Sequence, residues 1–338
     1  MQDIGNCSHV HWNGPGSVFY NGMIAPLARQ LGKPAALVYY QGENNMWDRI
    51  GQYHCSSNAL ATAWRDAFAA STTASIPWFI IQLAPCCGNN FDLLVGNNIR
   101  EAQRRASLSI ADAHLVVLND LGAAGGLLPP DMMQWSCYNH DHPGNPPAPQ
   151  THPGNKTEAG RRLGLQLWKR LYMAEDRMQA AHSSSSSTVP NPNTNSFTGP
   201  IVQSLRLEDN NIVVSFEASS AQTLQWAPSH NCSCYTGSHP CCNPITQFAQ
   251  LSNLSLQHDQ SSLEHNSTRS HSWINASASV CDTNHLCIAV PPGFTPKWVR
   301  FQYLSQPPCV LTNHAGLPGS LFLLSTTRIS SETDRVGN

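Results

Sequence analysis

Three short apolar runs, each preceded by a helical pattern, constrain the first 120 residues more than any other feature. The runs cover residues 35–40 (AALVYY), 78–83 (WFIIQL) and 114–119 (HLVVLN). Apolar residues at helical spacing occur in 21–32, 58–70 and 97–107. Near-continuous apolar strands that alternate with helices are typical of parallel sheets covered on both faces. We therefore expect an α/β fold.

Polar or turn-forming residues follow each predicted strand at once. They are Gln41-Gly42-Glu43-Asn44, Pro85-Cys86-Cys87-Gly88 and Asn119-Asp120. The carboxyl ends of parallel strands meet at one edge of the sheet, and open α/β sheets bind their ligands there. We expect the functional site at this edge.

The pattern changes in the second half of the chain. The stretch HSSSSSTVPNPNTNSFTGP cannot bury apolar area and indicates a linker. Beyond it, residues 212–216 and 298–303 alternate with period two, which predicts strands of a β-sandwich. The predicted division is an α/β domain over 1–178, a linker over 179–200 and a small cysteine-containing β domain over 201–328.

Composition excludes several classes of protein. Hydrophobic residues make up 41% of the chain, which is typical of a globular protein. The net charge is −2, so nothing favours nucleic acid or an anionic membrane surface as a partner. No apolar run approaches the ~20 residues that a membrane span needs.

Twelve cysteines and six Asn-X-Ser/Thr sequons favour a secreted or lysosomal protein. The sequons begin at Asn6, Asn155, Asn231, Asn253, Asn266 and Asn275. Residues 1–20 nevertheless lack the basic start and apolar middle of a signal peptide. Either the protein is cytosolic or its true N-terminus lies upstream.

His152 is the candidate general base. A rigid proline follows it, just before a predicted helix over 157–174, and a neutral imidazole there can accept a proton from a serine hydroxyl. The alternative is that His152 is one of fifteen histidines, many of them in loops. His142 lies in a similar His-Pro-Gly-Asn stretch, which we assign to a loop. The acids that could orient the imidazole are Asp120, Asp131 and Asp141, and spacing does not choose among them.

The predicted helix over 157–174 carries its own start signal. Asn155 can cap it, and Glu158 can reach back to form a capping box. Its expected buried stripe consists of Leu163, Leu167, Trp168, Leu171 and Tyr172.

Gln41 and Gly42 could form part of an oxyanion site. The Gln41 amide would donate to the developing negative oxygen, and Gly42 would let the chain turn tightly. The alternative is an ordinary turn after a strand, with Glu43 in a salt bridge.

The cysteines allow two interpretations. Cys232, Cys234, Cys241 and Cys242 could bind zinc, but their spacing is not the paired C-x₂-C pattern, and nearby sequons favour disulfides. Cys86-Cys87 could supply a thiol nucleophile, although a pair of half-cystines is the simpler interpretation.

Several short motifs follow one another between residues 17 and 172. They are Ser17-Val18-Phe19-Tyr20-Asn21-Gly22-Met23-Ile24-Ala25-Pro26-Leu27, Tyr40-Gln41-Gly42-Glu43-Asn44-Asn45, Ala63-Trp64-Arg65-Asp66, Gln82-Leu83, Arg100-Glu101-Ala102-Gln103, Asn119-Asp120-Leu121-Gly122 and His152-Pro153-Gly154-Asn155-Lys156 with Gly160-Arg161-Arg162-Leu163. In order and spacing they resemble the sialate O-acetylesterases of the SGNH hydrolase superfamily. Residues 298–322 resemble the C-terminal β region of that family more weakly.

The resemblance implies a serine esterase that removes acetyl groups from a sugar, either sialic acid or a polysaccharide. The fold would be an SGNH-hydrolase-like parallel sheet flanked by helices. His152 would act as base, Gln41 would help form the oxyanion hole, and Glu43 would be a buried organiser of the loop rather than the base. No cofactor or metal is implied.

Two departures from the family pattern matter. The family's nucleophile lies in a Gly-Gln-Ser-Asn stretch upstream of the first motif, and no residue here matches it. Relatives carry Asp within three residues before the catalytic His, where this chain has Pro149, Gln150 and Thr151. Asp141 is our choice for the acid. We expect a C-terminal part of a longer secreted or lysosomal esterase, inactive by itself, with an incomplete sheet whose edge is open.

Three other functions remain open at this point. A carbohydrate acetylesterase acting on plant or microbial polysaccharide belongs to the same class. A non-catalytic carbohydrate-binding or scaffold protein would explain the missing serine. A zinc-dependent deacetylase is the third.

Overall fold

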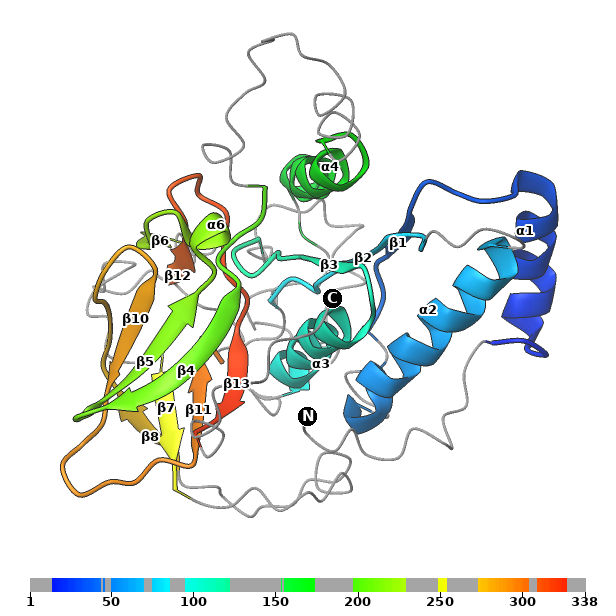
Figure 1. Ribbon diagram of the computed structural model, residues 1–338. Helices are drawn as coiled ribbons and strands as arrows, with labels where there is room; N and C mark the ends of the chain where they lie inside the picture. The colour runs from blue at the N-terminus through cyan, green and yellow to red at the C-terminus, as the bar shows by residue number, and fades with distance from the viewer. Residues whose placement is uncertain are drawn as a thin grey trace, which may run out of the picture.

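A computed structural model gives the fold of the chain (Figure 1). The residues that it describes are 14–43, 45, 50–69, 75–85, 95–121, 153, 155–173, 197–228, 249–253, 273–303 and 309–326. Within them a parallel three-stranded sheet comes first and antiparallel sheets follow. The protein is therefore a mixed α/β structure.

The first part alternates helices with strands, as the periodicity predicts. Its elements are η2 (Tyr20–Ile24), α1 (Ala25–Leu31), β1 (Leu37–Tyr39), η4 (Ile50–Gln52), α2 (Tyr53–Ala69), β2 (Trp78–Ile81), α3 (Val95–Ser109), β3 (Ala113–Val116) and α4 (Lys156–Leu171). The strands run parallel in the order β1-β2-β3, so their carboxyl ends reach the same edge. Their bounds fall within three residues of the apolar runs, because the last residues of each run already belong to that edge.

The two faces of the parallel sheet are covered differently. On one face, Leu37, Trp78 and Ile80 pack with apolar residues of η2, α2 and α3. On the other face, α4 packs through Ala159 and Leu163 against residues from the ends of β2 and β3. Successive side chains of a strand point to opposite faces, which explains why these runs are apolar on both sides.

Two predicted apolar stripes are less buried than their periodicity suggests. On α4, Leu163 packs against the sheet, but Trp168 and Tyr172 are exposed and stack on each other with ring centroids 4.9 Å apart. On η2–α1, Ile24 is buried while the other large apolar residues are exposed. Periodicity shows that a helix has an apolar face, but it does not show what covers that face.

The second part is built from antiparallel sheets. Its elements are β4 (Val202–Glu208), β5 (Asn211–Phe216), α6 (Ala218–Ala221), β6 (Gln225–Pro228), β7 (Ala249–Ser252), β8 (Ile274–Ala276), β9 (Ala278–Val280), β10 (His285–Ala289), β11 (Trp298–Phe301), β12 (Cys309–Thr312) and β13 (Phe322–Ser325). One sheet has the order β4-β5-β10-β9, another β13-β11-β7-β8, and β12 pairs with β6.

One hydrophobic core joins the two four-stranded sheets. Val214 and Ile288 come from the first sheet, and Leu251, Val299 and Phe322 from the second, and all are fully buried. The sheets therefore pack face to face as in a sandwich. Strand β13 lies beside α3, so the second part adjoins the first (Figure 1).

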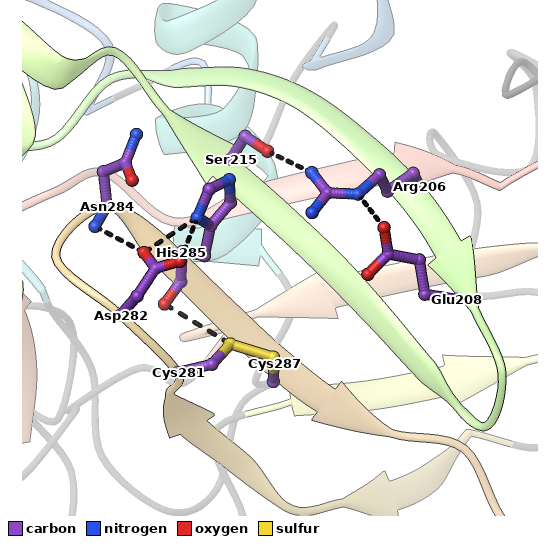
Figure 2. The surroundings of a disulfide bond; sticks show 8 residues. All are labelled: Arg206, Glu208, Ser215, Cys281, Asp282, Asn284, His285 and Cys287. Carbon is purple, nitrogen blue, oxygen red and sulfur yellow. Dashed lines mark hydrogen bonds and ion pairs between the residues drawn. A yellow bond between two sulfur atoms is a disulfide. The ribbon is translucent and has the colours of Figure 1, made fainter.

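A disulfide closes the hairpin between β9 and β10. Cys281 bonds to Cys287, with their Cα atoms 5.8 Å apart (Figure 2). Beside the disulfide, an Asp282 carboxylate oxygen lies 2.7 Å from Nδ1 of His285, at hydrogen-bond distance. Cys55 at the start of α2 is also disulfide-bonded. The cysteines that we considered as zinc ligands or thiol nucleophiles lie outside the described residues.

Candidate active site

Residues 41–43 leave the carboxyl end of β1 and form the centre of the candidate site. Two side chains donate hydrogen bonds to the backbone carbonyl of Gln41: Tyr53 Oη at 2.8 Å and Gln103 Nε2 at 2.9 Å. Both donors belong to helices, α2 and α3, that pack beside the strand. The position of the backbone is therefore fixed where the strand ends.

The side-chain amide of Gln41 is held in one orientation. Tyr39 Oη donates to its Oε1 at 3.1 Å, and its Nε2 donates to Asn45 Oδ1 at 2.7 Å. An amide nitrogen carries two hydrogens, so a second N–H is available to donate to a ligand. This arrangement suits the oxyanion role, although the role itself stays a prediction.

Gly42 lies in a crowded, left-handed position. Its φ is 142°, and a Cβ atom there would approach side-chain atoms of Leu83, Ile99 and Gln103 to 3.2 Å each. Gln103 also accepts a hydrogen bond from the backbone N–H of Leu83 at 2.9 Å. It therefore links the carboxyl ends of β1 and β2, a role that sequence reasoning did not assign to it.

Charge and burial act on the tyrosines around this turn. Burial, and secondly the negative charge of Glu43, raises the pKa of Tyr39 and of Tyr40. Burial also raises the pKa of Tyr53. These hydroxyls consequently remain neutral hydrogen-bond donors at ordinary pH. Glu43 is only half-buried, so it is less buried than the loop organiser that we expected.

The start of α4 lies within electrostatic reach of the turn. Partial desolvation lowers the pKa of Lys156, and the charge of Glu43 acts in the opposite direction. Pro153 is buried. His152, which directly precedes Pro153 in the chain, and Asp141 both lie outside the described residues, so their candidate roles are untested.

A cap and a buried ion pair fix the position of α4. Asn155 Oδ1 accepts from the Glu158 backbone N–H at 3.0 Å, which confirms the predicted cap. The Glu158 carboxylate accepts from Arg161 and Arg162, so the second half of the predicted capping box is not formed. Arg162 donates to both carboxylate oxygens of Asp120, at 2.6 and 2.7 Å, and to the backbone carbonyl of Val117. Asp120 thus anchors α4 at the end of β3, which makes it a weaker candidate for orienting an imidazole.

The ends of β2 and β3 hold a buried polar network that the sequence pattern did not indicate. Arg100 donates to Asn119 Oδ1 at 2.5 Å and to Asn97 Oδ1. Asn119 donates to Gln302 Oε1 at 3.2 Å. Burial, partly offset by Tyr303, lowers the pKa of Arg100 to about 9.

A second contact of this network also crosses between the two parts of the protein. Gln82 Nε2 donates to the backbone carbonyl of Arg100 at 3.0 Å and to Ser320 Oγ at 2.8 Å. Because these side chains are buried and bonded to one another, this network is structural. Among the described residues at this edge, the turn after β1 is the part that carries a half-buried amide for a ligand.

The described residues contain no group of three or more His, Cys, Asp or Glu side chains placed to hold a metal ion. In the helices that the structure describes, no segment is long and apolar enough to cross a membrane.

No protein-family model matches the sequence, and no curated protein matches it. Among solved structures, the chain is similar to the crystal structure of a carbohydrate acetylesterase from Xanthomonas citri. The TM-score is 0.56 at 20% sequence identity, and the match covers 91% of this chain and 54% of that chain. The likeness shows a shared fold. The chain spans about half the length of the structure that it matches.

Proposed function

We propose that this chain is the C-terminal part of a carbohydrate O-acetylesterase that cleaves acetyl esters of sugars with a serine nucleophile. The observation that carries the proposal is the Gln41 amide, which Tyr39 and Asn45 hold at the edge of the sheet where ligands bind. The fold shared with a carbohydrate acetylesterase supports it. The finer assignment, to the sialate O-acetylesterases, rests on the sequence motifs.

In the proposed mechanism, a serine supplied from outside this chain attacks the acetyl carbonyl. His152 accepts the serine proton, and Asp141 orients the imidazole. Gln41 Nε2 donates to the oxyanion of the tetrahedral intermediate, which is stabilised most when the donor is already oriented. His152 then gives the proton to the sugar oxygen that leaves, and the acetyl group stays on the serine. Water, which His152 deprotonates, attacks this ester and releases acetate and the free serine.

The Glu43–Lys156 interaction supports the proposed place of the base. The charge of Glu43 acts on Lys156 at the start of α4, and His152 lies four residues before Lys156 in the sequence. We also propose that the protein is secreted or lysosomal, which the disulfide between Cys281 and Cys287 supports.

The test uses the protein at its natural length. Acetate release is measured from O-acetylated sialic acid and from acetylated xylan. We expect His152→Ala to abolish release and Gln41→Ala to lower kcat about 10²- to 10³-fold. Glu208→Ala, at the exposed end of β4, serves as the control and should leave kcat unchanged.

Two results would contradict the proposal. One is release that persists in the His152→Ala variant. The other is a native protein that neither releases acetate nor reacts with a serine-directed phosphonate.

A non-catalytic carbohydrate-binding protein is the second candidate, and a row of polar side chains on one sheet favours it. Gln250 donates to Asn275 Oδ1 at 2.8 Å and accepts from Arg300 Nε at 2.7 Å. The Arg300 guanidinium lies 4.2 Å from the ring centre of Trp273. Aromatic rings beside amides and guanidinium groups suit sugar hydroxyls and C–H faces. Sugar binding that is lost in Trp273→Ala but unchanged in His152→Ala would favour this candidate.

A further inference from the structure

Trp273 and Asn275 lie on the outer face of the sheet β13-β11-β7-β8 (Figure 1). The residues between and after them, Ile274 and Ala276, pack in the hydrophobic core on the inner face. Successive side chains of a strand point to opposite faces, so Trp273 and Asn275 both point outward. At two residues apart along an extended chain, they are separated by about 7 Å, a distance that one sugar ring can bridge.

Two neighbouring strands extend this site into a continuous surface. Arg300 of β11 is in register with Gln250 of β7, and Gln250 is in register with Asn275 of β8. The Gln250 amide donates to Asn275 Oδ1 at 2.8 Å. The Arg300 guanidinium lies 4.2 Å from the ring centre of Trp273. We call these four side chains the Asn275 surface.

The Asn275 surface has hydrogen-bonding capacity that is not used. Arg300 Nε donates to Gln250 Oε1 at 2.7 Å, which occupies one N–H of a guanidinium that carries several. In the part of the chain that the structure describes, no carboxylate pairs with Arg300, and Asn275 Nδ2 has no hydrogen-bond partner. Burial, partly offset by Tyr303, lowers the pKa of Arg300 to about 10. Asn275 itself is exposed, so its amide nitrogen is accessible from solvent.

The sequence distinguishes Asn275 from the other sequons. It begins the sequon Asn275-Ala276-Ser277, and Trp273 lies two positions before it. None of the other five sequons has an aromatic residue at that position, where they have Ile4, Pro153, Ser229, Leu251 and Glu264.

We propose that Asn275 carries an N-linked glycan whose first sugar packs on Trp273 and Arg300. The C–H face of this N-acetylglucosamine would lie on the Trp273 ring, whose face is electron-rich. Its acetamido oxygen would accept from the unused N–H groups of Arg300. A glycan in this place covers the surface that the second candidate function gives to free sugars, so the two proposals compete.

The glycan comes from a lipid-linked pyrophosphate oligosaccharide of the secretory pathway. Asn275 Nδ2 attacks C1 of the first N-acetylglucosamine and loses one proton. The C–N bond forms as the C–O bond to the pyrophosphate breaks, and the lipid pyrophosphate leaves. Asn275 Oδ1 takes no part, so its hydrogen bond from Gln250 is kept. The proposal therefore rests on the secreted or lysosomal location proposed above.

The first experiment measures whether Asn275 is occupied. The natural-length protein is produced in a secreting eukaryotic host, and an N-glycosidase releases its glycans in heavy-oxygen water. Mass spectrometry should find a glycan on most peptides that contain Asn275, and the oxygen label at Asn275 after release. Ser277→Ala should abolish both signals, because it removes the sequon and leaves the Asn275 side chain unchanged. No esterase activity is measured, so a failure here is distinct from a failure of the acetylesterase proposal.

The second experiment measures whether the sugar is held on the surface. We expect the N-glycosidase to release the Asn275 glycan from the folded protein about tenfold faster in Trp273→Ala, because the aromatic contact is lost. Trp273→Phe keeps an aromatic ring and should stay close to the unchanged protein. Trp168→Ala is the matched control, since Trp168 is an exposed tryptophan on α4, and it should not alter the rate. After unfolding, all variants should release this glycan at one rate.

Three results would overturn the proposal. One is a secreted protein whose Asn275 carries no glycan. Another is a release rate from the folded protein that is equal in Trp273→Ala and in the unchanged protein. The third is an equal acceleration by Trp168→Ala, which would show a general loosening of the protein and no contact with the sugar.

Discussion

The carboxyl ends of β2 and β3 and the carboxyl end of β1 lie at the same edge of the parallel sheet, but their surroundings differ. At β2 and β3, the side chains of Gln82, Arg100 and Asn119 are buried and bonded to one another or to the antiparallel part of the protein. At β1, Gln41 and Glu43 are half-buried, and helix side chains hold their backbone while leaving an amide N–H available.

The comparison shows that polar residues after a strand do not by themselves mark a catalytic site. All three strand ends looked alike in sequence. Among the described residues, Gln82 near the end of β2 and Asn119 after β3 contact the antiparallel part, whereas Gln41 and Glu43 after β1 stay half-buried. Substitutions in the buried network at β2 and β3 should therefore reduce global stability, whereas those at the β1 end should act mainly on the turn.

The largest effect should come from Arg100→Met in the buried network at β2 and β3. The buried amides of Asn97 and Asn119 lose a charged donor, so we expect the free energy of unfolding to fall by about 4 kcal/mol. Urea denaturation measures it. Arg206→Met, on β4 and paired with Glu208 at the surface, should cost less than about 0.5 kcal/mol. Equal effects of the two variants would remove the distinction.

Gly42→Ala should destabilise the turn at the β1 end by about 3 kcal/mol, because it adds backbone strain and crowding at once. Gly32→Ala is the matched control, since Gly32 also has a positive φ but no atom within 4 Å of an added Cβ. Its expected cost is about 1 kcal/mol, from strain alone. Thermal unfolding measures the stability of both variants. An equal loss of stability in the two would show that the crowding at Gly42 has no energetic cost.

Gln103→Leu should lower stability by about 2 kcal/mol, because the Leu83 N–H and the Gln41 carbonyl each lose a buried partner. Hydrogen exchange should increase most at Leu83 if the effect stays at the turn. Gln250→Leu is the control, because the side-chain hydrogen bonds of Gln250 lie on a β-sheet surface. We expect this variant to change stability little. A uniform increase in hydrogen exchange over α3, the parallel sheet and the antiparallel sheets would contradict a local role for Gln103.

The smallest effect should be a change in pH dependence. A hydrogen bond from Arg161, opposed by burial and aided by Arg162, lowers the pKa of Glu158 to about 2 from an ordinary 4.5. Because the folded pKa is the lower one, this stabilisation is present above pH 4.5 and is lost as the pH falls toward 2. In Glu158→Gln, the midpoint of thermal unfolding should fall less steeply between pH 5 and pH 2.5. Arg161→Met should give an intermediate slope, and an unchanged slope in both variants would contradict the assignment.

Much of the fold could be predicted from local patterns. Near-continuous apolar runs predicted the parallel strands, and apolar residues at helical spacing predicted their helices. The cap at Asn155 could also be predicted from the sequence. The exposure of Trp168 and Tyr172 could not be predicted, since an apolar face does not reveal its partner. The antiparallel part was predicted only in outline, because strands such as β8 and β9 are three residues long and too short to show a period.

The sequence by itself determined the alternation of helices and strands, the edge where a site could lie, and Gln41 as a residue at that edge. These follow from periodicity and from the geometry of parallel strands, which depend on neighbours in the chain. Only the tertiary structure decided that Arg100 and Asn119 bond across to Gln302, 183 positions beyond Asn119, and that Gln103 holds the Gln41 turn. Hydrogen bonds between residues so far apart leave no periodic signal, because the partners come together only when the sheets pack.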